Sequence, residues 1–130
     1  MGMFPSADLL KWLRDLPARR ALHTLRLIAA LLRKHREQEW PARLSETAER
    51  LHRVEDSGGP DETVSGMQEI LGFFGDTRSL RDVYLTDEAG HKIKPKDVPA
   101  VNAYLRALRT QLYLSARQAI ARVKWRLRRR

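Results

Sequence analysis

Cysteine is absent from this chain of 130 residues, which excludes a disulfide framework, a thiolate metal site and a cysteine nucleophile. Long hydrophobic runs are absent too. The longest nearly apolar stretch, Leu25 to Leu32, contains Arg26 and is far shorter than the ~20 residues that cross a bilayer. The N-terminal residues also lack the basic and then apolar segments of a secretory signal. A cytoplasmic location is the simplest prediction.

Acidic residues are missing from the C-terminal part of the chain. Nine basic side chains and no Asp or Glu lie between Val98 and Arg130, whereas residues 1–97 carry sixteen residues of each sign. The formal net charge of +9 therefore comes entirely from this segment. Such an asymmetry indicates either an acidic partner or a solvated helix end, and it does not choose between them.

Apolar side chains recur at steps of three and four residues along most of the chain, which predicts a mainly α-helical single domain over residues 1–130. We expect a bundle of about five helices. Their ranges are 6–16, 17–37, 40–54, 61–75 and, for a long C-terminal helix, from residue 97 or 99 to about residue 127. Glycine and proline at 57–60 predict a flexible loop. Gly66 and Gly72 lie inside the fourth range, so we expect a neighbouring element to pack closely there.

The hydrophobic period changes near residues 82–94. Asp82 to Thr86 alternates between polar and apolar, residues 87–90 have turn chemistry, and His91 to Lys94 are suited to pair back. This pattern predicts a small β-hairpin. Phe73 or Tyr84 is expected at the surface, available to a partner, unless the last helix covers both.

The C-terminal helix carries the first candidate site. On an ideal helix Arg106, Arg117, Lys124 and Arg128 fall within an arc of ~40° and form a basic line ~33 Å long. Arginine suits bidentate contact with phosphates, so this line is a candidate polyanion-binding surface. The full candidate set is Arg106, Arg117, Lys124, Arg126, Arg128, Arg129 and Arg130, and residues 121–130 form its basic end. A solvated helix end favoured by the helix dipole, a protein contact and an anionic membrane surface are the alternatives.

A polar stretch after the fourth helix carries the second candidate site, since functional groups often lie on such loops. The candidate partner-binding set is Asp76, Arg78, Ser79, Arg81, Asp82 and Tyr84. The stretch lacks the glycine spacing and the lysine of a phosphate-binding loop. It also lacks a Gly-x-Ser-x-Gly elbow, so Ser79 is a poor nucleophile candidate. The alternative is a structural connector in which the charged side chains pair internally.

No residue pattern predicts catalysis, a metal or a cofactor. Glu49 and His52 form one Glu-x-x-His step, of which a di-iron bundle needs two, and the chain has no second copy. A single step is typical of two exposed groups on a helix face. We therefore expect a non-enzymatic protein without a cofactor.

The order of these parts resembles a group of small, uncharacterised bacterial helical domains with a Phe-Gly-Gly-x-Gly-Ser-x-x-Asp-Leu segment. The matching positions are Phe74, Gly75, Ser79, Asp82 and Leu85, whereas Asp76 and Arg78 stand where the group has glycine. The likeness spans about residues 20–120. It implies a small cytoplasmic helical domain with one hairpin, and by analogy an immunity-type or accessory protein.

The sequence thus favours a small cytoplasmic protein-binding module that acts through residues 75–91, with the basic helix end steering an acidic protein partner. The competing hypothesis is nucleic-acid binding through the basic helix. The oligomeric state and the identity of the partner are left open by the sequence.

Overall fold

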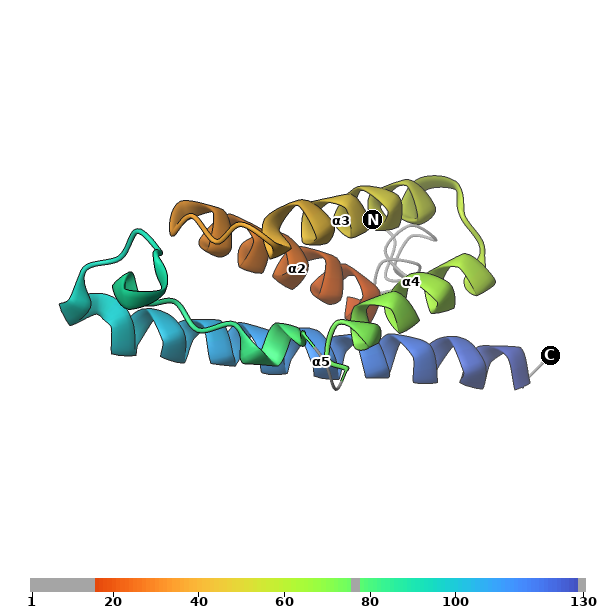
Figure 1. Ribbon diagram of the computed structural model, residues 1–130. Coiled ribbons are helices and arrows are strands. Elements are labelled where there is room, and N and C mark those ends of the chain that lie inside the picture. Colours follow the sequence, from red (N-terminus) through yellow and green to blue (C-terminus); the bar gives the residue numbers. More distant parts are fainter. Residues whose placement is uncertain (1–15, 76–77, 129–130) are drawn as a thin grey trace, which may run out of the picture.

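The computed structural model describes residues 16–75 and 78–128 (Figure 1). Over these ranges the chain forms four α-helices and three short 3-10 turns, and no β-strand. The helices are α2 (Leu16–Lys34), α3 (Trp40–Ser57), α4 (Pro60–Gly72) and α5 (Val98–Arg128). The prediction of a mainly helical protein is confirmed, whereas a bundle of five helices is not supported. The expected helix over residues 6–16 lies outside the described residues, apart from Leu16.

The helices run alternately in opposite directions and pack as a bundle (Figure 1). α2 and α4 both lie against α5, and α3 packs on α2 and α4. At 31 residues α5 is the longest helix and spans ~46 Å. Because α2 and α4 occupy one side of α5, the opposite side of this helix faces solvent along its length.

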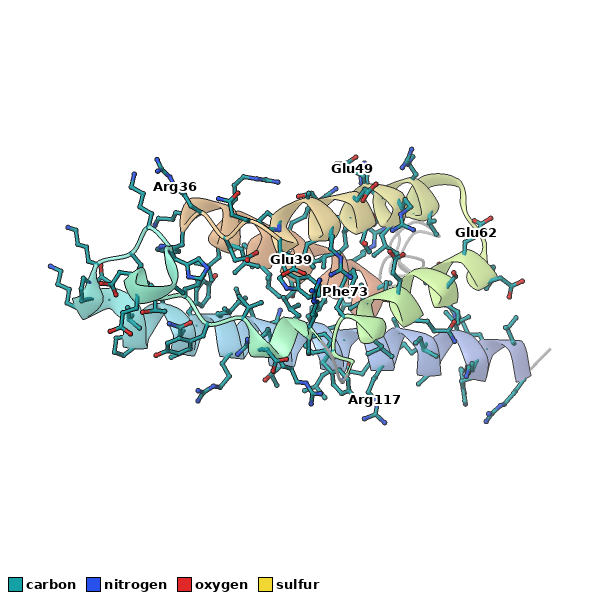
Figure 2. All side chains as sticks on the ribbon, viewed as in Figure 1. Arg36, Glu39, Glu49, Glu62, Phe73 and Arg117 are labelled. Carbon is teal, nitrogen blue, oxygen red and sulfur yellow. The ribbon has the colours of Figure 1, made fainter. Side chains whose placement is uncertain are left out.

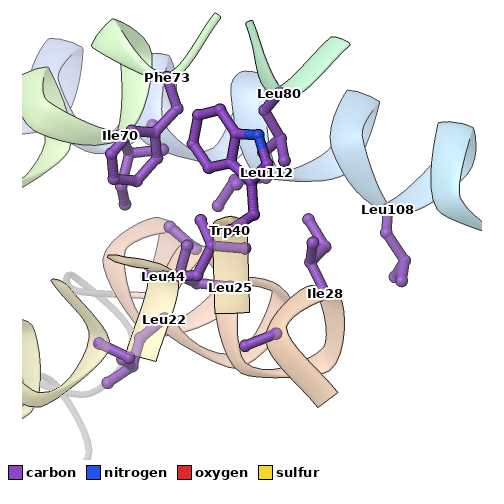
Figure 3. Close-up of a cluster of buried hydrophobic side chains, with 14 of the residues drawn as sticks. Leu22, Leu25, Ile28, Trp40, Leu44, Ile70, Phe73, Leu80, Leu108 and Leu112 are labelled. Carbon is purple, nitrogen blue, oxygen red and sulfur yellow. The ribbon is translucent and has the colours of Figure 1, made fainter. Parts of the chain in front are cut away.

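The core follows the predicted apolar spacing. Leu25 and Ile28 of α2, Leu44 of α3, Ile70 of α4 and Leu112 of α5 meet there and are fully buried (Figure 3). The predicted stripe of α5 is buried from Leu105 to Val123 but ends before Leu127, which is 43% exposed because the helix has passed the end of its neighbours. Side chains at three- and four-residue steps share one helix face, so the pattern alone located this core.

Trp40 and Phe73 close the core between α3 and the end of α4. Their rings meet edge to face at a centroid distance of 5.5 Å and an interplanar angle of 81°. Such a pair contributes about 0.5–1.5 kcal/mol beyond the area it buries. The guanidinium of Arg43 lies 4.2 Å from the centroid of the Trp40 ring and covers the pair from solvent. Phe73 is therefore a core residue (Figure 2).

The turn between α2 and α3 depends on a left-handed residue. Arg36 has a φ of 59°, which ends the helix before its predicted limit at residue 37 (Figure 2). The amide of Glu37 then donates to the carbonyl of Leu32 at 2.9 Å, satisfying a carbonyl that the helix end leaves open. The Glu37 carboxylate accepts from the amide of Trp40 at 2.7 Å and so starts α3.

Gly58 and Gly59 connect α3 to α4, within the segment where the sequence predicts a flexible loop. The close approach expected inside α4 occurs at Gly66 alone. A Cβ atom there would overlap the Cδ2 methyl of Leu51 on α3, whereas a Cβ at Gly72 would meet nothing within 4 Å. Gly66 therefore lets α3 and α4 approach each other, and Gly72 is the last residue of its helix.

The predicted β-hairpin is wrong. Residues 82–94 contain the end of one 3-10 turn, η1 (Leu80–Asp82), a second turn, η2 (Asp87–Ala89), and extended backbone, and a third turn, η3 (Pro95–Asp97), precedes α5. This connection runs back along α5 from the end of α4 to the start of α5 (Figure 1). Its alternation of exposed Tyr84 and buried Leu85 arises because one face of the extended segment lies on the helix bundle.

The side chain of Asn102 and the turn after α2 take the place of a partner strand. The amide group of Asn102 on α5 accepts from Leu85 N at 2.8 Å and donates to Leu85 O at 2.7 Å. At the other end of the connection, His35 O accepts from Lys92 N at 2.9 Å, and His35 Nδ1 lies 2.9 Å from Lys92 O. A backbone whose polar groups are satisfied in this way gains nothing from strand pairing.

Candidate binding surface on the last helix

The basic line predicted on the last helix lies on its solvent face. The side chains of Arg106, Arg117, Lys124 and Arg128 are all exposed on α5. Figure 2 shows Arg117 pointing away from α2 and α3. The ion pairs that join described side chains, Arg19 with Glu55 and Arg50 with Glu69, do not include any of these four cations. These four cations therefore keep their charge for an external anion.

The rest of the predicted polyanion set is distributed differently. Arg126 is half-buried and lies on the opposite flank of α5 from Lys124, together with Arg122. Both have contacts of their own within the protein. Arg129 and Arg130 lie outside the described residues. The basic line is therefore the face of the described helix on which the cations are all exposed, while the opposite flank carries exposed Arg122 and half-buried Arg126.

Large apolar side chains accompany the basic line. Tyr113 is 37% exposed, Leu114 50% and Trp125 57%, and all three belong to α5. The Tyr113 ring meets Phe74 edge to face at 5.4 Å, and the Arg117 guanidinium lies 5.7 Å from its centroid. Exposed aromatic residues together with arginine are the composition that protein interfaces favour at their centres.

The residues predicted in the loop have separate roles. Ser79 is buried and caps η1, because its hydroxyl accepts from Arg81 N at 3.0 Å and lies 3.4 Å from Phe73 O. The Asp82 carboxylate lies 3.4 Å from Ser79 N, so the pair forms a capping box. Ser79 is therefore a structural residue, and it is unavailable to a partner.

The exposed members of the predicted loop set are Arg78, Arg81, Asp82 and Tyr84. Tyr84 is 55% exposed, so of the two candidate surface aromatics it is the one at the surface. Arg78 has a φ of 47°, which directs the chain into η1. Asp76 lies outside the described residues. The structure therefore brings Arg81, from the loop, beside α5 but does not join the loop and the helix end into one site.

Neither predicted set includes Arg109, whose side chain links α5 to the connection that contains η1. Its Nη1 donates to three backbone carbonyls of the connection, those of Leu80 at 3.0 Å and of Arg81 and Val83 at 2.9 Å. Burial, together with the neighbouring positive charge of Arg106, lowers the pKa of Arg109, and the carboxylate of Asp82 opposes this effect. One sequence signal could have identified it, since on a helical projection Arg109 lies at the margin of the apolar stripe of α5.

An open groove lies where η1 meets α5. Three arginines line it, Arg81, Arg106 and Arg109, and its apolar wall consists of Phe74, Tyr113 and Leu114. No carboxylate lines the groove in the part of the chain that the structure describes. Thr110 also lines the groove, and we call these seven residues the arginine groove.

Other functional groups do not gather elsewhere in the described chain. Across residues 16–75 and 78–128, no three His, Asp or Glu side chains lie close enough together to hold a metal ion. Glu49 and His52 are exposed on α3. Within the same ranges no helix combines the length and the apolar character that a membrane span requires.

Comparisons of the chain with protein-family models, curated proteins and solved structures give no match. The resemblance to small bacterial helical domains is therefore neither supported nor contradicted by a relative.

Proposed function

We propose that this protein is a non-enzymatic module that binds an acidic protein partner along the solvent face of α5. The supporting observation is the combination on that face of four exposed cations without a carboxylate partner and the exposed apolar side chains of Tyr113 and Leu114. Exposed cations alone would be well solvated by water and would not indicate a partner. A partner that binds here would also bury the apolar surface beside the cations. Burial of apolar surface provides most of the binding free energy at protein interfaces.

The geometry of Tyr113 favours a protein over a nucleic acid, whereas Trp125, which is 57% exposed beside Lys124 and Arg128, suits either partner. Base stacking requires aromatic rings with an open face. The Tyr113 ring, which lies within the basic line, is packed against Phe74 and lies beneath Arg117. Leu114 offers apolar surface without a ring. An acidic helix or extended segment fits this face, because its apolar side chains can contact Leu114 while its carboxylates meet Arg106 and Arg117.

An immunity-type or accessory role and a cytoplasmic location belong to this proposal on sequence grounds. The role depends on the resemblance, and the location depends on the absence of cysteine. Residues 78–84 would extend the interface from α5, with Arg81 and Tyr84 as exposed contacts.

Site-specific photo-crosslinking in the native host tests the proposal. A photoreactive amino acid replaces Leu114 on the solvent face of α5, and in a matched control it replaces Ala30, an exposed residue of α2. We expect a protein adduct at residue 114 but not at residue 30, with an acidic cross-linked peptide identified by mass spectrometry. A lack of adducts at residue 114, or identical adducts at both positions, would overturn the proposal.

Nucleic-acid binding is the second candidate, because the basic line of α5 continues for about 33 Å without an acidic side chain. Neutralising four phosphates predicts a slope of log K against log salt of about −3 to −4. Fluorescence anisotropy with labelled duplex DNA, single-stranded DNA and RNA at two salt concentrations measures this slope. A chain ending at Ala121 and the R106Q/R117Q variant must both weaken binding. An affinity that does not fall as the salt concentration rises, or no binding at low salt, would exclude this candidate.

A further inference from the structure

The arginine groove holds three guanidinium groups together, and no carboxylate of the described residues lines it, although Asp82 lies close enough to act on Arg109. Arg106 and Arg109 are separated by one helical turn, and η1 brings Arg81 to the same groove. The positive charge of Arg106 is close enough to contribute to the lowered pKa of Arg109. Guanidinium groups held side by side repel each other, and an anion placed between them removes that repulsion.

Arg109 is pre-organised by its own hydrogen bonds. Its Nη1 is fixed on three carbonyl groups of the connection, so the guanidinium plane cannot rotate freely. A fixed guanidinium loses little conformational entropy when it binds a ligand. Arg81 and Arg106, by contrast, are exposed, and nothing in the described chain pairs with their charge. The groove therefore offers one rigid and two adaptable donors.

The opposite wall of the groove is apolar. Phe74 and Tyr113 form an edge-to-face pair at 5.4 Å, and Leu114 follows on α5 with half of its surface exposed. A free phosphate or chloride ion would leave this wall in water. A carboxylate on a peptide, with an apolar residue next to it, would use both sides of the groove.

We propose that the arginine groove is a carboxylate-binding subsite that anchors an aspartate or glutamate of the acidic partner. The carboxylate lies between the three guanidinium groups, and the residue beside it in the partner packs on the apolar wall. This inference rests on the proposed function, since it names the residue chemistry by which that partner is recognised. Binding of a carboxylate in the groove can be tested without the partner.

The test uses acetate as a probe on the full-length, isotopically labelled protein. NMR follows the Nε–H resonances of the arginines while acetate replaces chloride at constant ionic strength near neutral pH. We expect a saturable shift at Arg81, Arg106 and Arg109 with a Kd on the order of 10–100 mM, as a few charge-assisted hydrogen bonds give. Exposed Arg26 on α2 should not respond.

Matched variants complete the experiment. R81Q/R106Q removes the two exposed donors and leaves Arg109 on its carbonyls, so the fold is retained. It should weaken acetate binding at the remaining Arg109 by about tenfold or more. R26Q/K34Q removes the same charge from exposed positions of α2 and should leave binding unchanged. Equal weakening in both variants would show a non-specific charge effect and overturn the subsite.

Two further outcomes would also overturn it. A linear response of all exposed arginines, without saturation, would show that acetate has no site in the groove. Saturation by inorganic phosphate but not by acetate would show that the groove takes a phosphate instead. A negative acetate result and a negative cross-linking result can be told apart. An acidic protein cross-linked at residue 114 with no acetate response removes only the subsite, and the reverse result removes only the partner.

Discussion

The side-chain amide of Asn102 forms hydrogen bonds with both backbone polar groups of Leu85, at 2.8 Å to the nitrogen and 2.7 Å to the oxygen. This is the pattern by which one strand residue pairs with another, except that a helix supplies the partner. Asn102 also donates to Val98 O at 2.8 Å, in the first turn of α5. The residue thus joins the connection to α5 at the point where an isolated strand would need a neighbour.

Asn102→Ala should therefore destabilise the protein. The substitution leaves the N–H and the C=O of Leu85, a fully buried residue, without partners, at a cost of about 1–3 kcal/mol for each group. We expect a loss of about 2–4 kcal/mol in the free energy of unfolding, measured by chemical denaturation. Gln118→Ala, at an exposed position of the same helix, serves as the control and should change it by less than about 0.5 kcal/mol. Similar losses in both variants would contradict the role of Asn102.

This contact also explains why sequence patterns located the helices but not the connection. The stripes of α2 and α5 are periodic because a helix buries one face, and this can be predicted from spacing alone. Alternation over residues 82–86 is produced by any extended segment with one buried side. Whether a strand or the side chain of Asn102 satisfies its backbone depends on a residue in α5, far along the chain, which no local pattern reports.

Gly66→Ala tests the close approach of α3 and α4. A Cβ at this position would overlap the Leu51 Cδ2 atom and lie 3.3 Å from its Cγ, and Leu51 is buried in the core. Overpacking of this kind costs about 1–3 kcal/mol, which exceeds the gain of up to ~1 kcal/mol from replacing glycine in a helix. We expect net destabilisation in thermal unfolding.

Gly72→Ala is the matched control, because a Cβ there meets nothing within 4 Å. It should leave the melting temperature unchanged or raise it slightly. The double variant L51A/G66A should lose less stability than the sum of its two single changes, since the smaller side chain removes the overlap. Strict additivity would show that Gly66 does not act through Leu51.

Arg36→Gly should stabilise the protein. Arg36 adopts a φ of 59°, where a side chain costs about 1 kcal/mol that glycine avoids. Its side chain is exposed, so the substitution removes no buried contact. We expect a gain of about 0.5–1 kcal/mol in the free energy of unfolding. Lys34→Gly, two residues earlier and still helical, should have the opposite sign, and a loss in both variants would contradict this assignment.

The candidate site was only partly predictable, for a similar reason. Exposed Arg106 and Arg117 follow from their distance from the apolar stripe of α5. The groove does not, because it also needs Arg81, which η1 brings to α5 only after the connection has folded along the helix. Ser79 fails as a contact residue because its hydroxyl is used to cap that same turn. The sequence shows that Ser79 is polar, but it does not show which backbone groups its hydroxyl contacts.

Arg109→Met should separate the structural arginine from the ones proposed to bind. The variant keeps the length and apolar stem of the side chain but removes the Arg109 donor from three carbonyls of the connection, two of them partly buried. Of these, Leu80 O keeps the amide of Val83 as a donor. We expect a loss of about 1–3 kcal/mol in the free energy of unfolding and faster amide exchange at Asp82 and Val83, whose N–H groups bond within η1.

Arg106→Met is the control on the same helix. Arg106 is exposed, and its charge lowers the pKa of Arg109, so its removal relieves a repulsion. Its stability should stay within about 0.5 kcal/mol of the unmodified chain, with unchanged exchange at Val83, while acetate binding in the groove falls. If Arg106→Met destabilises η1 as much as Arg109→Met does, both arginines are structural. The charge of Arg106 is then not free for a partner, and the arginine groove loses one of its two adaptable donors.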